Sequence, residues 1–431
     1  MSNRLIIFSV DALVYEDLQE LEKKPFFKEI LDGGSRVNRM RSIYPTVTYP
    51  VHSTLITGTY PEKHGVINNE EFHVGQIASD WNWNRKSIKV EDIFDSAKKA
   101  GKTTAAVYWP VTGNHKSIDY LINEYCSLDK KADVHKLFSD AGTSEEVYEN
   151  VVKKYCDGLD VSTHPGSDIF CINCACEIIR RYKPDVIAIH PANIDGMRHK
   201  TGVFSSAVTE ELNVVEKQLE QIITATKNAG VFEETNFIIL SDHGQMNITR
   251  VVNPNVILKE AGLIETDENG KITDWKAYVH SAAMSAQVYL KDTQDKEIED
   301  KVYKLLCSLR DEQVYGIEEV FTAEEIKEKE HLSGDFSFVI ETDGFTTFGN
   351  DWNRPLVSPL DTTDYKFGHA THGYLPEKGP QPVFIAYGPD IERGVVLENG
   401  NVINVASTIV KLFGGSLESS DGQSMDEILK I

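Results

Sequence analysis

Along much of the chain, short and continuously apolar segments alternate with longer segments of helical periodicity. The apolar segments span residues 4–11, 102–110, 185–190, 236–244 and 382–389. The helical segments span residues 25–34, 90–100, 176–183, 207–229 and 404–415. A short strand that is apolar throughout is typical of a sheet buried on both faces. The alternation therefore predicts an α/β fold, with a mostly parallel sheet sandwiched between helices.

The pattern changes between residues 252 and 349, where acidic loops surround shorter elements. Residues 281–290 and 336–344 have the pattern of strands, residues 295–311 that of a helix, and residues 314–329 that of a strand followed by a helix. This order is typical of a small α+β unit. We expect a catalytic domain over residues 1–251 and 350–431, with an inserted α+β cap domain over residues 252–349.

The charge balance narrows the range of partners. The 431 residues include 44 Lys plus Arg and 67 Asp plus Glu, which gives a net charge of −23. This charge repels polyanions and argues against a nucleic acid polymer as partner, so that a small anionic substrate would need a local source of positive charge such as bound metal ions. The sequence shows neither a signal peptide nor an apolar stretch of about 20 residues, so we expect a cytoplasmic protein without a membrane partner. The oligomeric state stays open.

Three of the six cysteines lie close together in the sequence CINCAC. Cys171 and Cys174 have a spacing found in zinc sites, but no second pair of cysteines or nearby histidines completes four ligands. The segment also continues into a helical pattern. We interpret these residues, with Cys126, Cys156 and Cys307, as reduced thiols.

Three of the apolar segments end in an acid or are soon followed by one: Asp11, Asp195 and Asp242. Ligands of an open parallel sheet bind beyond the carboxyl ends of its strands, where these acids are expected to lie. Histidines accompany two of them, since His199 follows Asp195 by four residues and His243 follows Asp242 directly. The sequence HATHGY adds His369 and His372 late in the chain. Carboxylates mixed with imidazoles favour Zn²⁺, with Mn²⁺ or Fe as alternatives. Six such ligands, with one of the two late histidines among them, are too many for one tetrahedral ion and suit two ions with open positions.

These motifs, taken in order, resemble the alkaline phosphatase superfamily, and within it the nucleotide pyrophosphatase/phosphodiesterase family. The segment TYPVHSTLITGTYPEKHGVINN is similar to the nucleophile segment of that family, and THGY is similar to its late His-Gly-Tyr motif. The resemblance implies an alkaline phosphatase-like fold with two metal ions. The implied ligands of one ion are Asp11, Thr48, Asp242 and His243, and those of the other are Asp195, His199 and His372.

The resemblance also implies that Thr48 is the nucleophile and that Asn69 binds the phosphate. A threonine hydroxyl reacts poorly unless a cation lowers its pKa. Pro50 suits the first turn of a helix, which would place Thr48 at a helix N-terminus that favours a phosphoryl oxygen. The neutral Asn69 favours a diester, because a phosphomonoester dianion would favour an arginine.

The nucleotide-cleaving members of the family hold the base with an aromatic residue five positions before the aspartate that corresponds to Asp195. This chain has His190 at that position, and Tyr49, next to the nucleophile, could form the other wall of a base slot. Packing beneath the loop is an equally good interpretation of Tyr49. Three tryptophans, Trp81, Trp83 and Trp109, could line a pocket, although burial between helix and sheet is the more common fate of this residue.

We therefore expect a hydrolase that cleaves phosphodiester or pyrophosphate bonds of small nucleotide-type substrates through a phospho-threonine intermediate. The alternatives within the superfamily are a phosphomonoesterase and an enzyme like phosphonoacetate hydrolase. The latter would need positive side chains, for which Lys63, Arg85 and Lys86 are candidates. A sulfatase would have Cys or Ser in place of Thr48, and a phosphoglycerate mutase would have Ser. A remote alternative is an inert metal-binding scaffold.

Overall fold

The structure is a computed structural model, and it describes residues 4–124, 133–156 and 163–430. Its main element is an eight-stranded sheet in the order β19-β2-β18-β6-β1-β5-β3-β4. The strands are β1 (Arg4–Ser9), β2 (Ser35–Arg41), β3 (Thr104–Val107), β4 (Tyr120–Ile122), β5 (Val186–Ile189), β6 (Thr235–Leu240), β18 (Phe384–Tyr387) and β19 (Val396–Asn401). Only β18 runs antiparallel to its neighbours β2 and β6 in this sheet. The predicted mostly parallel sheet is confirmed.

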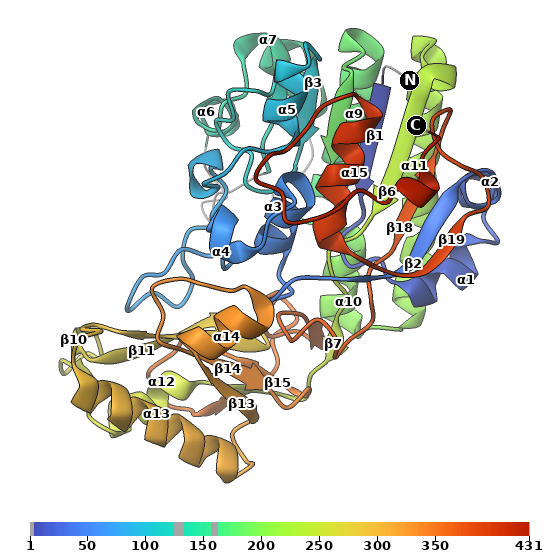
Figure 1. Ribbon diagram of the computed structural model, residues 1–431. Helices are drawn as coiled ribbons and strands as arrows, with labels where there is room; N and C mark the ends of the chain where they lie inside the picture. Colours follow the sequence, from blue (N-terminus) through green and yellow to red (C-terminus); the bar gives the residue numbers. More distant parts are fainter. Residues whose placement is uncertain (1–3, 125–132, 157–162, 431) are drawn as a thin grey trace.

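Helices cover both faces of the sheet (Figure 1). One apolar core joins the sheet to α2 (Pro25–Gly33), α9 (Gly166–Tyr182) and α11 (Ser206–Ala229). A second core joins the other face to α3 (Thr48–Thr57), α5 (Ile93–Lys99) and α15 (Val405–Leu412). In β1, Ile6 and Phe8 belong to the first core and Leu5 and Ile7 to the second. This alternation explains why the strand is apolar at every position.

Residues 250–358 form most of a second lobe, at the lower left of Figure 1. A four-stranded antiparallel sheet has the order β11 (Ala277–Ala282), β12 (Ser285–Leu290), β14 (Phe338–Thr342) and β13 (Ile317–Thr322). The helices α12 (Pro254–Glu260), α13 (Lys296–Asp311) and α14 (Ala323–Glu330) accompany this sheet. Strand β8 (Arg250–Val252) pairs with β15 (Thr346–Phe348) and with β16 (Val357–Ser358), so the chain enters and leaves the lobe side by side.

The cysteine-containing segment forms part of α9 and is buried in the core on that face of the sheet. Cys171 and Cys174 are free thiols, and burial raises the pKa of both. A neutral thiol in an apolar core is a poor metal ligand, which agrees with the interpretation of reduced thiols. Cys126 lies outside the described residues.

None of the helices in the described ranges combines the length and the apolar character needed to cross a bilayer.

Candidate metal centre and nucleophile

The three adjacent central strands β6, β1 and β5 position the predicted metal ligands. Asp11 follows the end of β1, Asp242 follows the end of β6, and the loop after β5 leads into α10 (Asn193–Thr201). Parallel strands end at the same edge of a sheet, so residues distant in sequence meet there. This edge brings together the six predicted carboxylate and imidazole ligands in two groups of three.

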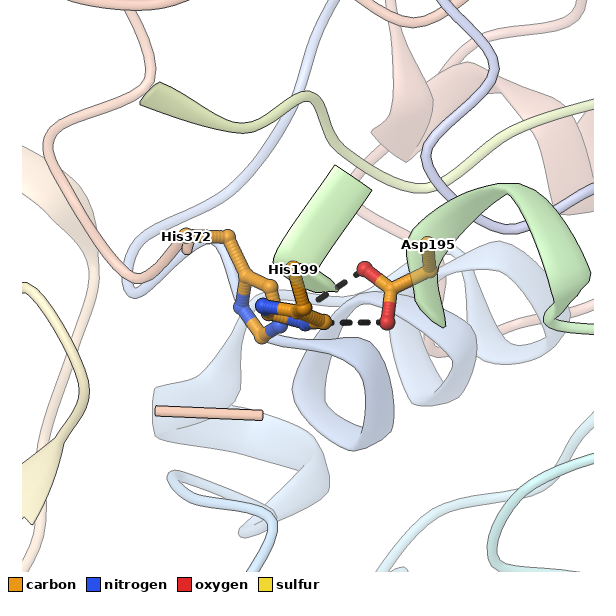
Figure 2. Close-up of side chains that lie close together, drawn as sticks. All are labelled: Asp195, His199 and His372. Carbon is orange, nitrogen blue, oxygen red and sulfur yellow. Dashed lines mark ion pairs between the residues drawn. The ribbon is translucent and has the colours of Figure 1, made fainter. Parts of the chain in front are cut away.

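The first group consists of Asp195, His199 and His372, and Figure 2 shows their side chains converging. Asp195 and His199 are one turn apart on α10, with 3.0 Å between Asp195 Oδ2 and His199 Nε2. His372 comes from the segment after β17 (Ala370–Thr371), and its Nε2 lies 3.9 Å from Asp195 Oδ1. His369, the other late histidine, is exposed and does not belong to this group.

Backbone carbonyls fix the orientation of both imidazoles. His199 Nδ1 lies 2.7 Å from the carbonyl oxygen of Ala370, and His372 Nδ1 lies 3.1 Å from that of Thr46. A carbonyl only accepts, so each Nδ1 donates and each Nε2 is directed toward Asp195. Burial also lowers the pKa of His372, which keeps its ring neutral. Neutral imidazoles held in this way are typical metal ligands.

The second group consists of Asp11, Asp242 and His243, and all three side chains are buried. His243 Nε2 is 3.2 Å from Asp242 Oδ2 and 3.7 Å from Asp11 Oδ1. The hydroxyl oxygen of Thr48 lies 3.2 Å from the same nitrogen. The potential ligand atoms of the three residues thus lie within 4.8 Å of one another, and the hydroxyl of Thr48 lies beside one of them.

The donor atoms of these groups fit divalent cations. Asp11 Oδ1, Asp242 Oδ2 and His199 Nε2 are buried and have no hydrogen-bond partner among the described residues. Burial, and after it the neighbouring carboxylates of Asp242 and Asp195, raise the pKa of Asp11 well above its usual range. Two buried carboxylates that repel one another, each with one oxygen that makes no hydrogen bond, are strongly unfavourable unless positive charge is added. Carboxylate and imidazole donors in this number suit two divalent transition-metal ions.

Thr48 is the first residue of α3, as the position of Pro50 predicts. Its backbone carbonyl accepts a hydrogen bond from Nδ1 of His52, at 2.9 Å, and Nε2 of His52 lies 2.9 Å from the hydroxyl of Ser9. His52 is thus part of the support of the nucleophile segment. The sequence motifs gave it no role, because its partners come from β1 and from its own helix.

Asn69 lies next to the start of α3. Its Oδ1 accepts a hydrogen bond of 2.8 Å from the backbone N–H of Tyr49, which fixes the orientation of the amide. Asn69 Nδ2 is buried and makes no hydrogen bond within the described part of the chain. This arrangement leaves a donor for an oxygen of the substrate near Thr48, which is the position expected of a phosphate-binding asparagine.

The structure places the two predicted base-binding residues behind the site. His190 is 2% exposed, and its Nε2 lies 3.1 Å from Asp11 Oδ2 while its ring packs on His52. Tyr49 is 1% exposed, and its hydroxyl donates to Glu124 at 2.6 Å. His190 therefore orients Asp11, and neither ring offers a free face, so the structure gives their base-stacking role no support.

Sequence motifs also missed the groups that support the site. Gln245 Nε2 donates to Asp195 Oδ1 at 2.5 Å and thereby orients this ligand. Lys366 and Glu70 form a buried ion pair of 2.7 Å, and the hydroxyl of Tyr365 donates to the same carboxylate oxygen at 3.2 Å. Hydrophobicity and spacing carry no signal for these contacts, because the partners lie far apart in the sequence.

A third cluster, Asp92, Asp95 and His115, has a similar composition but a different environment. Arg85 lies 2.8 Å from Asp92 and 3.0 Å from Asp95, and His115 lies 2.9 Å from Asp92. These contacts already neutralise the carboxylates, so the cluster is a structural ion-pair network. Arg85 is thereby committed to this network and Lys63 is paired with Asp421, which leaves both poorly suited to a substrate carboxylate.

A sheet edge with two candidate metal groups, a hydroxyl beside one of them and an amide donor near it lies in an alkaline phosphatase-like fold. The sequence profile of the family type I phosphodiesterase/nucleotide pyrophosphatase matches residues 5–375. The chain belongs to this family, whose members use two divalent metal ions. The resemblance identified from the sequence motifs is confirmed.

Two of the curated relatives match nearly all of the chain at low identity. Ectonucleotide pyrophosphatase/phosphodiesterase 1 of Saccharomyces cerevisiae is 24% identical, over 97% of this chain and 58% of its own length. Family member 3 of Mus musculus is 23% identical, over 99% of this chain and 44% of its own length. The chain thus spans about half the length of these relatives.

Solved structures support the fold. Human ectonucleotide pyrophosphatase/phosphodiesterase 5 matches with a TM-score of 0.69 and 18% identity over the whole of both chains. An inactive variant of the murine enzyme, solved with AMP, matches with a TM-score of 0.66 and 19% identity, again over both whole chains.

Proposed function

We propose that the chain hydrolyses phosphodiester or pyrophosphate bonds of small nucleotide-type substrates through a phospho-threonine intermediate. The observation that carries this proposal is the position of Thr48. Its hydroxyl lies 3.2 Å from His243 Nε2, within the group that includes Asp11 and Asp242, and it begins a helix. The unpartnered amide of Asn69 lies beside the same helix start.

In the proposed reaction, Thr48 Oγ1 attacks phosphorus, and a bond to Oγ1 forms as the bond to the leaving oxygen breaks. Asn69 Nδ2 donates to a non-bridging oxygen, and the helix N-terminus favours the same negative charge. Water then hydrolyses the phospho-threonine and restores the hydroxyl. Divalent ions in the two groups, Zn²⁺ by the chemistry of the donors or Mn²⁺, would lower the pKa of the hydroxyl and neutralise the developing charge.

The charges near Asn69 support a diester rather than a monoester. Asn69 is neutral, and Lys366, a buried cation near this segment, is already paired with Glu70 at 2.7 Å. A phosphomonoester brings two negative charges and needs additional positive side chains, whereas a diester brings one. The neighbouring inactive structure supports the rest of the proposal, since it is a threonine-to-alanine variant and was solved with AMP.

A substrate panel with Zn²⁺ and with Mn²⁺ tests the proposal. We expect kcat/KM to be highest for diesters such as bis(p-nitrophenyl) phosphate and a nucleotide ester, compared with p-nitrophenyl phosphate and phosphonoacetate. A preference for p-nitrophenyl phosphate would indicate a phosphomonoesterase instead, and a preference for phosphonoacetate would indicate C–P cleavage. Full metal loading with no turnover of any substrate would indicate a scaffold.

Two substitutions separate the nucleophile from the metal ligands. Thr48→Ala should abolish turnover, by at least roughly a thousandfold, and retain both ions, while Thr48→Ser should keep measurable activity because it keeps a hydroxyl. Asp242→Ala should lose one ion and activity together, as elemental analysis of the purified protein would show. Unchanged turnover in Thr48→Ala would refute the covalent mechanism.

A further inference from the structure

We propose that Glu341 of the second lobe is a positioning residue for the reaction, and that it holds the chain segments which carry Thr48 and His372. Glu341 lies on β14 in the second lobe (Figure 1), whereas Thr48 and His372 lie at the edge of the eight-stranded sheet. The inference rests on the proposed function, because it assigns a support to the same nucleophile and to one of the metal groups.

The carboxylate of Glu341 is fully buried and accepts hydrogen bonds from two separate segments. The hydroxyl of Tyr44 donates to Oε2 at 2.9 Å, and the backbone N–H of Leu375 donates to Oε1 at 3.0 Å. Tyr44 precedes Thr48 by four residues, and Leu375 follows His372 by three. One side chain thus ties both segments to the second lobe.

A cation balances this buried carboxylate. Lys378 Nζ lies 3.0 Å from Glu341 Oε1, and it also donates to the carbonyl oxygen of Thr342 at 2.7 Å. A buried carboxylate with a cation and two hydrogen-bond donors is compensated, and its removal leaves the donors without their acceptor. The hydrogen bonds are directional, so the carboxylate fixes where the two segments lie as well as joining them.

Closer to the site, the same two segments are bonded to each other through Thr46. Its carbonyl oxygen lies 3.1 Å from Nδ1 of His372, and its hydroxyl donates to the carbonyl oxygen of Tyr374 at 2.9 Å. Thr46 lies two residues before Thr48, which begins α3. The position that Glu341 sets is therefore passed to the imidazole of His372 and to the start of the nucleophile helix.

This arrangement makes the distance between the two halves of the site depend on one remote side chain. Thr48 lies beside the group of Asp11, and His372 belongs to the group of Asp195. A displacement of about 1 Å between reacting groups can lower a rate about a hundredfold. We therefore expect the loss of Glu341 to lower kcat more than it changes KM, and to weaken the ion that His372 helps to hold.

The variants Glu341→Leu and Glu341→Gln test this role at pH 8, above the pKa of about 7 to which burial raises the Glu341 carboxyl. In calorimetric titration of the metal-free protein with Zn²⁺, Glu341→Leu should raise the Kd of one ion about tenfold and change that of the other less than about twofold. With saturating Zn²⁺ and bis(p-nitrophenyl) phosphate, its kcat should fall about 10–100-fold and its KM change less than about threefold. Glu341→Gln should restore most of both properties, because its amide oxygen still accepts from Leu375 and its amide nitrogen can donate to the hydroxyl of Tyr44.

Asp343→Leu is the matched control. Asp343 lies two residues further along the same lobe, pairs with Arg250 at 2.7 Å and accepts from the N–H of Phe345, which belong to neither segment. The control should keep both Kd values and kcat within about twofold of the wild type. Urea unfolding of each variant separates positioning from stability, because a residue that only stabilised the fold would lower the unfolding midpoint and leave kcat and both Kd values unchanged.

Unchanged Kd values and kcat in folded Glu341→Leu, or equal weakening of both ions, would overturn the inference. If this variant does not fold, Tyr44→Phe keeps the ring and removes one donor. It should raise the Kd of one ion about threefold, and no change in Kd or kcat would overturn the inference.

The metal titration separates this inference from the proposed function, because it needs no turnover. If the wild type hydrolyses none of the esters, the proposed function fails and the titration still decides the role of Glu341. If the wild type is active and Glu341→Leu matches it in kcat and in both Kd values, the positioning role is refuted while the hydrolase stands.

Discussion

Acid should destabilise the protein through His64, which ends the short helix α4 (Pro61–His64) directly after the nucleophile helix. Its Nδ1 accepts a hydrogen bond of 3.1 Å from the backbone N–H of Val66, so the neutral ring is the form that fits. Its Nε2 lies 3.1 Å from the hydroxyl of Thr54. Burial lowers the pKa of His64 to about 3.

The size and the sign of the effect follow from this pKa. In the unfolded chain a histidine has a pKa of about 6.5, so by pH 5 the unfolded state holds nearly one proton at this residue that the native state does not. The free energy of unfolding therefore falls as the pH falls. The contribution of His64 to this loss between pH 7 and pH 5 is about 2 kcal/mol. This contribution of His64 to the free energy of unfolding is present above the unfolded pKa of about 6.5, and its loss continues toward pH 3.

Urea unfolding at pH 7, 6 and 5 would measure this contribution as the difference between the wild type and His64→Gln, in which the side chain cannot titrate. Other groups that titrate, including the metal ligands, affect both proteins and cancel in the difference. The difference should shrink by about 2 kcal/mol from pH 7 to pH 5. His73→Gln is the control, because the side chain of His73 is 48% exposed. Parallel pH curves for the wild type and His64→Gln would refute the reasoning.

Two further substitutions test buried polar contacts near the candidate metal groups. Arg198→Leu should lower the free energy of unfolding by about 3–5 kcal/mol, because this fully buried arginine pairs with Asp17 and its loss leaves a buried carboxylate unpaired. Thermal unfolding of the variant and the wild type measures this loss. A loss below about 1 kcal/mol would argue against a strong pair. Gln245→Leu should weaken binding of one of the two ions by about 10–100-fold, because Gln245 orients Asp195. A metal titration of the variant that shows two unchanged sites would contradict this role.

The parts of the site that could be predicted from the sequence are those fixed by short-range geometry. The four-residue spacing of Asp195 and His199 places both on one face of α10, and the acids Asp11 and Asp242 follow apolar strands that turn out to be adjacent. These relations need only the helix repeat and the rule that parallel strands end at a common edge. For the same reason Thr48, two residues before Pro50, could be placed at the start of a helix.

The contacts between loops near the site could not be predicted in this way. Trp81 and Tyr365 lie on loops separated by most of the chain, and their contact depends on Glu70 and Lys366, whose pairing has no periodic signature. For His190, the spacing pointed to a contact that differs from the one in the structure. Its position relative to Asp195 suggested a substrate contact, but the end of β5 turns its side chain toward Asp11. The spacing of residues thus predicted where the helices and strands lie. The packing between loops, which the sequence does not show, decides which side chains face the site.

Contacts between loops also join the second lobe to the candidate metal groups. Residues 281–290 read as one strand, but the chain turns at Ala283, which has a φ of 63°, and forms the hairpin of β11 and β12. At this turn the N–H of Met284 donates to the carbonyl of His372 at 3.0 Å. Gly373, with a φ of 95°, lies so close to the turn that a Cβ would meet the carbonyl oxygen of Ala282 at 2.0 Å. Gly373 is therefore required by contact with the second lobe, and this lobe helps to position His372, a predicted metal ligand.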